Sequence, residues 1–214
     1  MRHTSSILRF CYNAGMNHLA TEQPLKNAYF AMRHGTSVAN EEGVIVSDPT
    51  KGVAGYGLSE KGRKEVRAAA QRAKETGLLD AHTIVISSDF TRARETAEML
   101  VDTLDLDMVT TTPKLRERFF GAWDGTHNDN YQKVWADDAH NATHTANGVE
   151  SVAAVLDRAT KLIAELEQNY AGKPIVLVSH GDTLQILQTA FADVSPETHR
   201  SLTPLHTAEI RKLN

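Results

Sequence analysis

Three short apolar runs, each followed by a segment with helical periodicity, constrain the fold of this chain more than any other feature of its sequence. The runs cover residues 29–32, 83–86 and 175–179. Apolar runs of about four to eight residues that alternate with helical segments are typical of parallel strands covered by helices on both faces. We therefore predict an α/β fold, a three-layer α/β/α sandwich with a mainly parallel central sheet and a small helical and loop cap.

Apolar spacing, capping residues, glycine and proline predict where the individual elements begin and end. Residues 43–58, which are rich in glycine, are expected to form a long loop, and residues 124–148 a mobile polar insert. Ser59 is the expected N-cap of the first long helix. The expected strands are 28–33, 83–88, 108–112 at a sheet edge, 175–179 and 207–212. The expected helices are 60–76, 90–103, 149–170 and 182–191.

Length and composition limit the number of domains and the kinds of partner. The 214 residues favour one domain at 27–214, preceded by a disordered N-terminal extension at 1–26. A net charge of −4 argues against general nucleic-acid binding, which needs a cationic face. No apolar run approaches the roughly 20 residues of a membrane-spanning helix. Cys11 is the only cysteine, so we expect no intrachain disulfide, no cysteine-based metal site and a reducing, cytoplasmic location.

The first 21 residues leave an alternative to the cytoplasmic location open. They contain no acidic residue and carry Arg2 and Arg9 among hydroxylated and apolar residues. This composition is similar to that of an organelle transit segment. The other interpretations are a disordered leader, or a segment that precedes a true start at Met16.

Histidine and arginine residues follow the predicted strands at the points where those strands end. Arg33 and His34 come after the first apolar run, Arg92 after the second and His180 after the third. Ligands of open α/β sheets bind beyond the carboxyl ends of the strands, so we expect these side chains to meet in one place. Two arginines suit a phosphate, because each guanidinium presents paired N–H donors. A neutral histidine that is held by a carbonyl acceptor suits nucleophilic attack.

Glu117 is the candidate for proton transfer. A carboxyl group that faces a dianionic phosphate has a raised pKa, because like charges disfavour its ionisation. Glu117 can then protonate the leaving alkoxide and later accept a proton from the attacking water. His180, when charged, would stabilise the negative charge that develops on the transferred group.

Taken together, these residues form motifs that resemble those of the histidine phosphatase superfamily, which includes the phosphoglycerate mutases. The resemblance covers about residues 28–212, and Thr36 departs from the Glu or Gln that often follows the first His-Gly. It implies a phosphohistidine intermediate on His34, Glu117 as proton donor, and no metal or other cofactor. It also implies a phosphate pocket of Arg33, Arg92 and His180, with further donors from Ser37 and Asn40. The motifs are Arg33-His34-Gly35-Thr36-Ser37-Val38-Ala39-Asn40, Ser88 to Ala97 with Arg92, Glu117 before Gly121 and Trp123, and Ser179-His180-Gly181.

Metal-independent hydrolysis of small phosphate monoesters is the function that these residues favour, with a small phosphorylated metabolite as the binding partner. A mutase needs extra cations for a substrate with several anionic groups, and residues 124–148 contain no arginine. We expect the acidic side chains of this insert to repel polyanions, and to favour a neutral or amine-bearing leaving group such as that of phosphoserine. These acidic residues are Asp124, Asp129, Asp137 and Asp138.

Two other functions stay open at this point. Arg116 and Arg118 can supply cations for phosphoryl transfer of the phosphoglycerate mutase type. A non-catalytic module that binds phosphorylated ligands is the second alternative. The sequence does not fix the oligomeric state, and a homodimer is one of the options.

The insert at 124–148 also carries residues with two interpretations. Tyr131 and Trp135 either shape the leaving-group pocket or pack the cap onto the sheet, and the second is favoured. Three histidines either form a metal site or lie on a solvated, partly helical cap, and the cap is again favoured. They are His127, His140 and His144.

Overall fold

A five-stranded sheet with the order β3-β2-β4-β1-β5 forms the centre of the structure, a computed structural model that describes residues 17–19 and 24–214. All neighbouring strands are parallel except β5, which runs antiparallel to β1. This confirms the predicted α/β class and the mainly parallel sheet. The strands are β1 (Ala28–Arg33), β2 (Ile84–Ser88), β3 (Val109–Thr112), β4 (Pro174–Ser179) and β5 (Ile210–Lys212).

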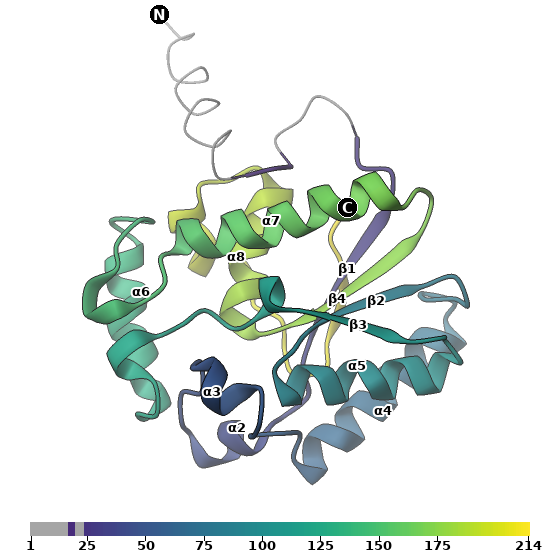
Figure 1. Cartoon of the computed structure of the whole chain (residues 1–214), viewed down its shortest axis with the longest axis horizontal. Helices are drawn as coiled ribbons and strands as arrows, with labels where there is room; N and C mark the ends of the chain where they lie inside the picture. The colour runs from purple at the N-terminus through teal and green to yellow at the C-terminus, as the bar shows by residue number, and fades with distance from the viewer. Residues whose placement is uncertain (1–16, 20–23) are drawn as a thin grey trace, which may run out of the picture.

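Helices cover both faces of this sheet, as Figure 1 shows. Alternate residues of a strand point to opposite faces, so β1 directs Phe30 and Met32 toward one layer and Tyr29 and Ala31 toward the other. The first layer is α4 (Glu60–Glu75) and α5 (Thr91–Leu104), and the second is α7 (Val152–Asn169) and α8 (Gly181–Ala192). Because both of their faces are buried, the central strands β1, β2 and β4 are largely apolar instead of alternating with polar residues.

Serine side chains begin the two longest helices. Ser59 accepts a hydrogen bond from the backbone N–H of Gly62 at the start of α4, which confirms its predicted role as N-cap. Ser151 accepts from the N–H of Ala154 at the start of α7. Each cap satisfies a backbone donor that the first turn of a helix leaves without a partner.

The segment that was expected to form a long loop contains a helix, and so does the cap, which was expected to be partly helical. α2 (Val38–Glu42) ends just before residues 43–58, and α3 (Pro49–Gly52) lies within them. The Asp48 carboxylate caps α3 and proline occupies its first turn, and these local signals outweigh the neighbouring glycines. The insert contains α6 (Tyr131–Asp138), which Figure 1 shows at one end of the molecule.

The insert packs onto neighbouring segments through a small apolar cluster, which the polar composition of residues 124–148 concealed. Val134 of α6 packs with Ile45, Phe120 and Val149, and all four side chains are buried. Short 3₁₀ turns connect the remaining elements. They are η1 (Pro113–Leu115), η2 (Gly121–Trp123), η3 (Asn128–Asn130), η4 (Ala146–Gly148) and η5 (Pro196–Ser201).

Part of the expected N-terminal extension packs against the domain. Asn17 is buried, the backbone N–H of His18 donates to Thr160 Oγ1 of α7 at 3.2 Å, and the N–H of Lys26 donates to Glu167 Oε2 at 2.6 Å. The expectation that residues 1–26 lie outside the fold is therefore wrong for these positions. Residues 1–16 and 20–23, with the transit-segment and Met16 interpretations, lie outside the described residues. No helix in the described part of the chain is long and apolar enough to cross a membrane.

Two glycines let the loop after β1 approach α4. A Cβ atom on Gly35 would lie 2.7 Å from the carbonyl oxygen of Gly62, and one on Gly62 would lie 1.9 Å from that of Thr36. Neither backbone can accommodate a methyl group at these separations. The packing of α4 against this loop therefore depends on glycine at both positions.

We expect Gly62→Ala to lower the free energy of unfolding by more than about 2 kcal/mol, because the colliding atom belongs to the backbone and cannot rotate away. The loss exceeds the roughly 1 kcal/mol that alanine gains over glycine in a helix. Urea unfolding measures this difference. The matched control is Gly55→Ala, whose Cβ would meet no atom closer than 3.4 Å and should change stability by less than about 1 kcal/mol. Equal stability of the two variants would contradict the packing argument.

Candidate active site

The carboxyl ends of β1, β2 and β4 lie side by side in the sheet and bring the predicted residues together. Arg33 is paired with Ser179 at the ends of β1 and β4, and the N–H of His34 donates to the Ser179 carbonyl at 3.0 Å. Arg92 lies in the first turn of α5, which follows β2. A cavity of about 310 Å³ opens at this edge. Five of the predicted site residues line it: Arg33, His34, Asn40, Arg92 and Glu117.

Hydrogen bonds fix the tautomer of the buried His34 ring. Nδ1 lies 2.8 Å from the carbonyl oxygen of Gly35, which can only accept, so Nδ1 carries the proton. Nε2 lies 3.1 Å from Nε of Arg92, which can only donate, so Nε2 carries the lone pair. Burial and the charges of Arg92 and Arg33 lower the pKa of His34 well below its usual value. The ring is therefore neutral, with a nucleophilic nitrogen at the cavity.

His180 lies behind His34, with the ring centroids 5.1 Å apart. Its side chain is fully buried, and its Nε2 lies 2.9 Å from Ser88 Oγ. Burial, and then the charge of Arg92, lower the pKa of His180 well below its usual value. Its Nδ1 is buried and has no hydrogen-bond partner among the described residues.

Two further buried nitrogens at this edge lack partners in the described part of the chain: Nε of Arg33 and Nη1 of Arg92. The other donors of these arginines hold the backbone around the cavity. Arg33 Nη1 donates to the Leu205 carbonyl at 2.9 Å, and Arg92 Nη2 donates to that of Val46 at 2.9 Å. A buried donor without an acceptor is costly, so these nitrogens favour an acceptor-rich ligand between them.

The Glu117 carboxyl group is buried with one oxygen occupied. The backbone N–H groups of Arg118 and Thr183 both donate to Oε1, at 3.0 and 3.2 Å. Burial and the negative charge of Asp182 raise the pKa of Glu117, and the positive charge of Arg92 opposes them in part. Because Oε1 accepts both backbone donors, a proton on this carboxyl group resides on Oε2.

Ser37 differs from the other predicted residues, because its hydroxyl group is used within the chain. It caps α2 by accepting from the N–H of Asn40, and it donates to Asn40 Oδ1 at 3.0 Å. The Ser37 side chain is fully buried and is not among the residues that line the cavity. Its hydroxyl therefore holds Asn40, which does line the cavity.

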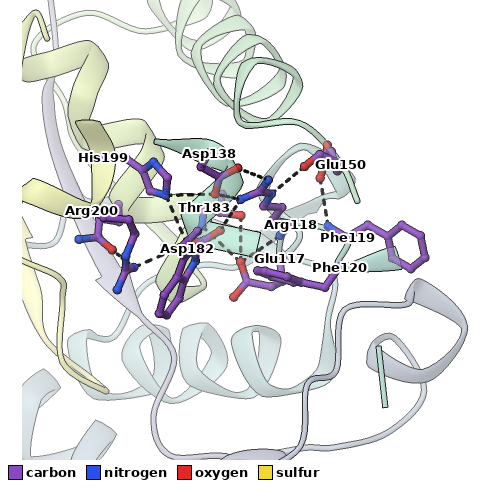
Figure 2. A network of polar contacts seen from close by, with 12 residues as sticks. Glu117, Arg118, Phe119, Phe120, Asp138, Glu150, Asp182, Thr183, His199 and Arg200 are labelled. Carbon is purple, nitrogen blue, oxygen red and sulfur yellow. Dashed lines mark hydrogen bonds and ion pairs between the residues drawn. The ribbon is translucent and has the colours of Figure 1, made fainter. Parts of the chain in front are cut away.

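The cations expected from Arg116 and Arg118 do not reach the cavity. Arg116 forms a bidentate pair with Asp89, at 2.8 and 2.6 Å. Arg118 is fully buried and forms a bidentate pair with Asp138, at 2.6 and 2.7 Å, as Figure 2 shows. Both guanidinium groups therefore form ion pairs within the protein and do not contribute a cation to the cavity.

The acidic insert does not present its charges to the cavity either. Asp138 points inward to Arg118, and Asp124 accepts from Lys51 at 2.6 Å and from the N–H of Ser47 at 2.6 Å. None of the four insert aspartates lines the cavity. The expected electrostatic repulsion of polyanions by this segment therefore has no structural basis. Asp124 and Asp138 are buried in contacts within the chain, which composition does not show, and Asp129 and Asp137 are exposed outside the cavity.

Residues that the sequence did not single out form the far side of the cavity. Arg200 belongs to η5, where no motif or periodicity pointed to it. Asp182 and Gln185 belong to the first turns of α8, and their position just after the second His-Gly was the signal available. Tyr131 and Trp135 line the cavity, and Trp135 Nε1 also donates to Asp182 Oδ1 of α8 at 3.0 Å, so Trp135 both shapes the cavity and attaches the cap.

Histidines of the insert are separated from one another. His144 Nε2 contacts Asp138 Oδ1 at 2.7 Å, and His127 Nδ1 lies 3.1 Å from Asp129. No group of three or more His, Cys, Asp or Glu side chains among residues 17–19 and 24–214 is arranged to hold a metal ion.

Comparisons with known proteins agree on one family. The model described as "Histidine phosphatase superfamily (branch 1)" matches residues 29–214. A metal-independent phosphoserine phosphatase of Arabidopsis thaliana is 27% identical over 174 residues, which are 77% of this chain and 68% of that protein. A 2,3-bisphosphoglycerate-dependent phosphoglycerate mutase of Bartonella henselae is 34% identical over 111 residues, about half of each protein.

Solved structures show the same similarity. A mycobacterial glucosyl-3-phosphoglycerate phosphatase in a complex with VO3 matches with a TM-score of 0.72 and 26% identity. The match covers 86% of this chain and 88% of that protein. The arrangement of strands and helices described above is therefore shared along nearly the whole length of both chains.

We expect the His34 ring to stay neutral, with its proton on Nδ1, when the pH falls below about 6.5, where an unperturbed histidine gains a proton. Burial and two neighbouring arginines cause this by lowering the pKa of His34. Two-bond ¹⁵N–¹H spectra report the tautomer, and His34→Asn identifies the signals. Free histidine in the same buffer is the control. If the His34 ring gained its second proton at the same pH as free histidine, the described environment would be wrong.

Proposed function

The chain belongs to the histidine phosphatase superfamily, and we propose that it is a phosphatase that hydrolyses small phosphate monoesters through a phosphohistidine intermediate on His34. One observation carries this proposal. Arg33 and Arg92, which line the cavity, and His180, whose ring lies against that of His34, each carry a buried nitrogen without a partner among the described residues, and His34 holds an unprotonated Nε2 beside them. A phosphoryl group offers oxygen acceptors to all three while its phosphorus faces the nucleophile.

In the first step, Nε2 of His34 attacks phosphorus, and the bond from phosphorus to the ester oxygen breaks. The Nδ1–H bond to Gly35 compensates the positive charge that forms on the ring. Oε2 of Glu117 gives its proton to the departing alkoxide. Arg92 moves its Nε donor from His34 to a phosphoryl oxygen, since the lone pair of Nε2 is consumed.

In the second step, Glu117 accepts a proton from water as the water oxygen attacks phosphorus. The bond between phosphorus and Nε2 breaks, which releases inorganic phosphate and restores neutral His34. His180 can donate from Nδ1 throughout. Ser88 Oγ already accepts from the N–H of Phe90 at 3.3 Å, so its own hydrogen can bond to Nε2 of His180 and leave the proton on Nδ1.

The size of the cavity supports a small phosphorylated metabolite as the substrate. About 310 Å³ lies at the lower end of the range for ligand pockets, roughly 300–1,000 Å³. A cytoplasmic location remains the prediction from the single cysteine.

Phosphoryl transfer of the mutase type is the second candidate, because Arg200 adds a cation to the cavity and one similar protein is named as such a mutase. A mutase must hold two phosphates and a carboxylate at once. Beyond the phosphate pocket, Arg200 is the one arginine or lysine among the described residues that line the cavity. This charge balance favours hydrolysis.

Wild-type protein should release p-nitrophenol from p-nitrophenyl phosphate in the presence of EDTA. His34→Ala should lower the rate by more than about a thousand-fold, as the loss of a covalent nucleophile does in other enzymes. His206→Ala, which changes an exposed histidine, is the control and should keep the wild-type rate.

Two results would overturn this function in different ways. Activity that EDTA removes would contradict metal independence. Absence of hydrolysis, together with interconversion of phosphoglycerates after priming with 2,3-bisphosphoglycerate, would establish the mutase instead.

Glu117→Gln should lower kcat/KM for glycerol 3-phosphate by about 10²–10⁴-fold, because the alkoxide then lacks its proton donor. The loss on p-nitrophenyl phosphate should be much smaller, since nitrophenolate leaves without a proton. In the wild type, kcat/KM for glycerol 3-phosphate should fall as the pH rises through the raised pKa of Glu117, because the acid must be protonated. Steady-state kinetics across pH test this. Equal losses on both esters, or an unchanged alkaline limb in Glu117→Gln, would argue against the role.

A further inference from the structure

Arg200 lies on the side of the cavity that the phosphate pocket does not occupy. Its guanidinium carbon stands 3.6 Å from the centre of the Trp135 ring, and its side chain is 35% exposed. Stacking on the indole keeps the guanidinium plane in a fixed orientation and removes one of its faces from water. A ligand in the cavity therefore meets the edge of the Arg200 guanidinium group.

One nitrogen of the Arg200 guanidinium group is bonded to the protein, and the other two are available to a ligand. Nη1 donates to Gln185 Oε1 and lies 3.7 Å from Asp182 Oδ1. Its Nε and Nη2 make no hydrogen bond to any residue that the structure describes. Two adjacent N–H groups on one edge match the two oxygens of a carboxylate.

The segment that carries Arg200 is fixed to the site on both sides. His199 is fully buried, and its Nε2 lies 3.9 Å from Asp138 and 3.8 Å from Asp182, as Figure 2 shows. Further along the chain, the Leu205 carbonyl accepts from Arg33 Nη1 at 2.9 Å. Between His199 and Leu205, the Leu202 carbonyl accepts from Gln185 Nε2 of α8 at 2.6 Å. The segment that carries Arg200 is thereby attached to α8 and β1, so Arg200 is positioned before a ligand arrives.

The acidic side chains that line the cavity do not offer a matching site for an amine. Asp182 Oδ1 accepts from Trp135 Nε1 at 3.0 Å, and its Oδ2 accepts from Arg118 Nη1 at 3.2 Å. Glu117 is the other lining acid, and the proposed reaction requires its proton. The far side of the cavity therefore complements an anion better than a cation.

We propose that Arg200, stacked on Trp135, binds a carboxylate of the leaving group, so that the preferred substrates are phosphate esters of small hydroxy acids. This inference rests on the proposed phosphatase function, and it assigns to Arg200 a role in substrate specificity. It replaces the expectation, drawn from the acidic insert, of a neutral or amine-bearing leaving group.

Two esters that differ in one group test the proposal. 3-Phosphoglycerate carries a carboxylate where glycerol 3-phosphate carries a hydroxymethyl group. Wild-type kcat/KM should favour 3-phosphoglycerate by at least about ten-fold, the effect of one charge-assisted hydrogen bond. Arg200→Met should lower kcat/KM for 3-phosphoglycerate at least about ten-fold more than for glycerol 3-phosphate. Arg94→Met, which removes a surface arginine paired only with Glu98, is the matched control and should keep the preference.

The outcomes separate this inference from the proposed function. Hydrolysis that depends on His34 but shows no preference, or equal losses on both esters in Arg200→Met, would overturn the carboxylate site alone. If no ester is hydrolysed, calorimetric titration of His34→Ala with the same two compounds still decides the matter. Tighter binding of 3-phosphoglycerate that disappears in His34→Ala/Arg200→Met supports the site, and equal affinities overturn it. Faster turnover of propane-1,3-diol bisphosphate than of 3-phosphoglycerate would assign Arg200 to a second phosphate instead.

Discussion

The buried ion pair between Arg118 and Asp138 joins the insert to the catalytic edge of the sheet. Both side chains are inaccessible to solvent, and their two hydrogen bonds are 2.6 and 2.7 Å long. Removing one partner of such a pair typically costs about 3–5 kcal/mol, because the other charge is left buried and alone. Arg118 follows Glu117 directly, so the pair fixes the backbone from which the Glu117 carboxyl group projects. The same contact holds α6, and with it Trp135, over the cavity.

Asp182 connects this ion pair to Trp135 and Arg200 at the far side of the cavity. It accepts from Arg118 and from Trp135, and its negative charge helps to raise the pKa of Glu117. His180, two residues before Asp182, belongs to the proposed phosphate pocket, and Nη1 of Arg200 lies 3.7 Å from Asp182 Oδ1. One side chain thus influences the proposed proton donor and contacts the proposed carboxylate site. Glu117, Arg118, Asp138, Asp182 and Arg200 thus belong to one network of polar contacts, which Figure 2 shows.

Local patterns in the sequence were sufficient for the sheet and for the phosphate end of the site. Buried strands are short apolar runs, and parallel strands place their following residues at one edge, so His34, Arg92 and His180 were predictable as neighbours. Ser59 was recognisable as a cap because capping acts over three residues. Ser37 was expected to serve the ligand, but its hydroxyl is bonded to Asn40, three residues ahead. The motif thus identified the right segment, but it did not show that Asn40 lines the cavity while Ser37 only holds Asn40 in place.

The sequence by itself determined the fold class, the family, and which residues gather where the strands end, because these depend on periodicity and on contacts within a few residues. Only the tertiary structure decided which charges remain available. Asp138 looked like a surface acid and is buried against Arg118, twenty residues away, while Arg200 lacked any signal and lines the cavity. Ion pairs between residues that are far apart in the sequence neutralise some charged side chains, and others stay accessible to a ligand. Composition counts charges, but packing decides which of them a substrate can reach.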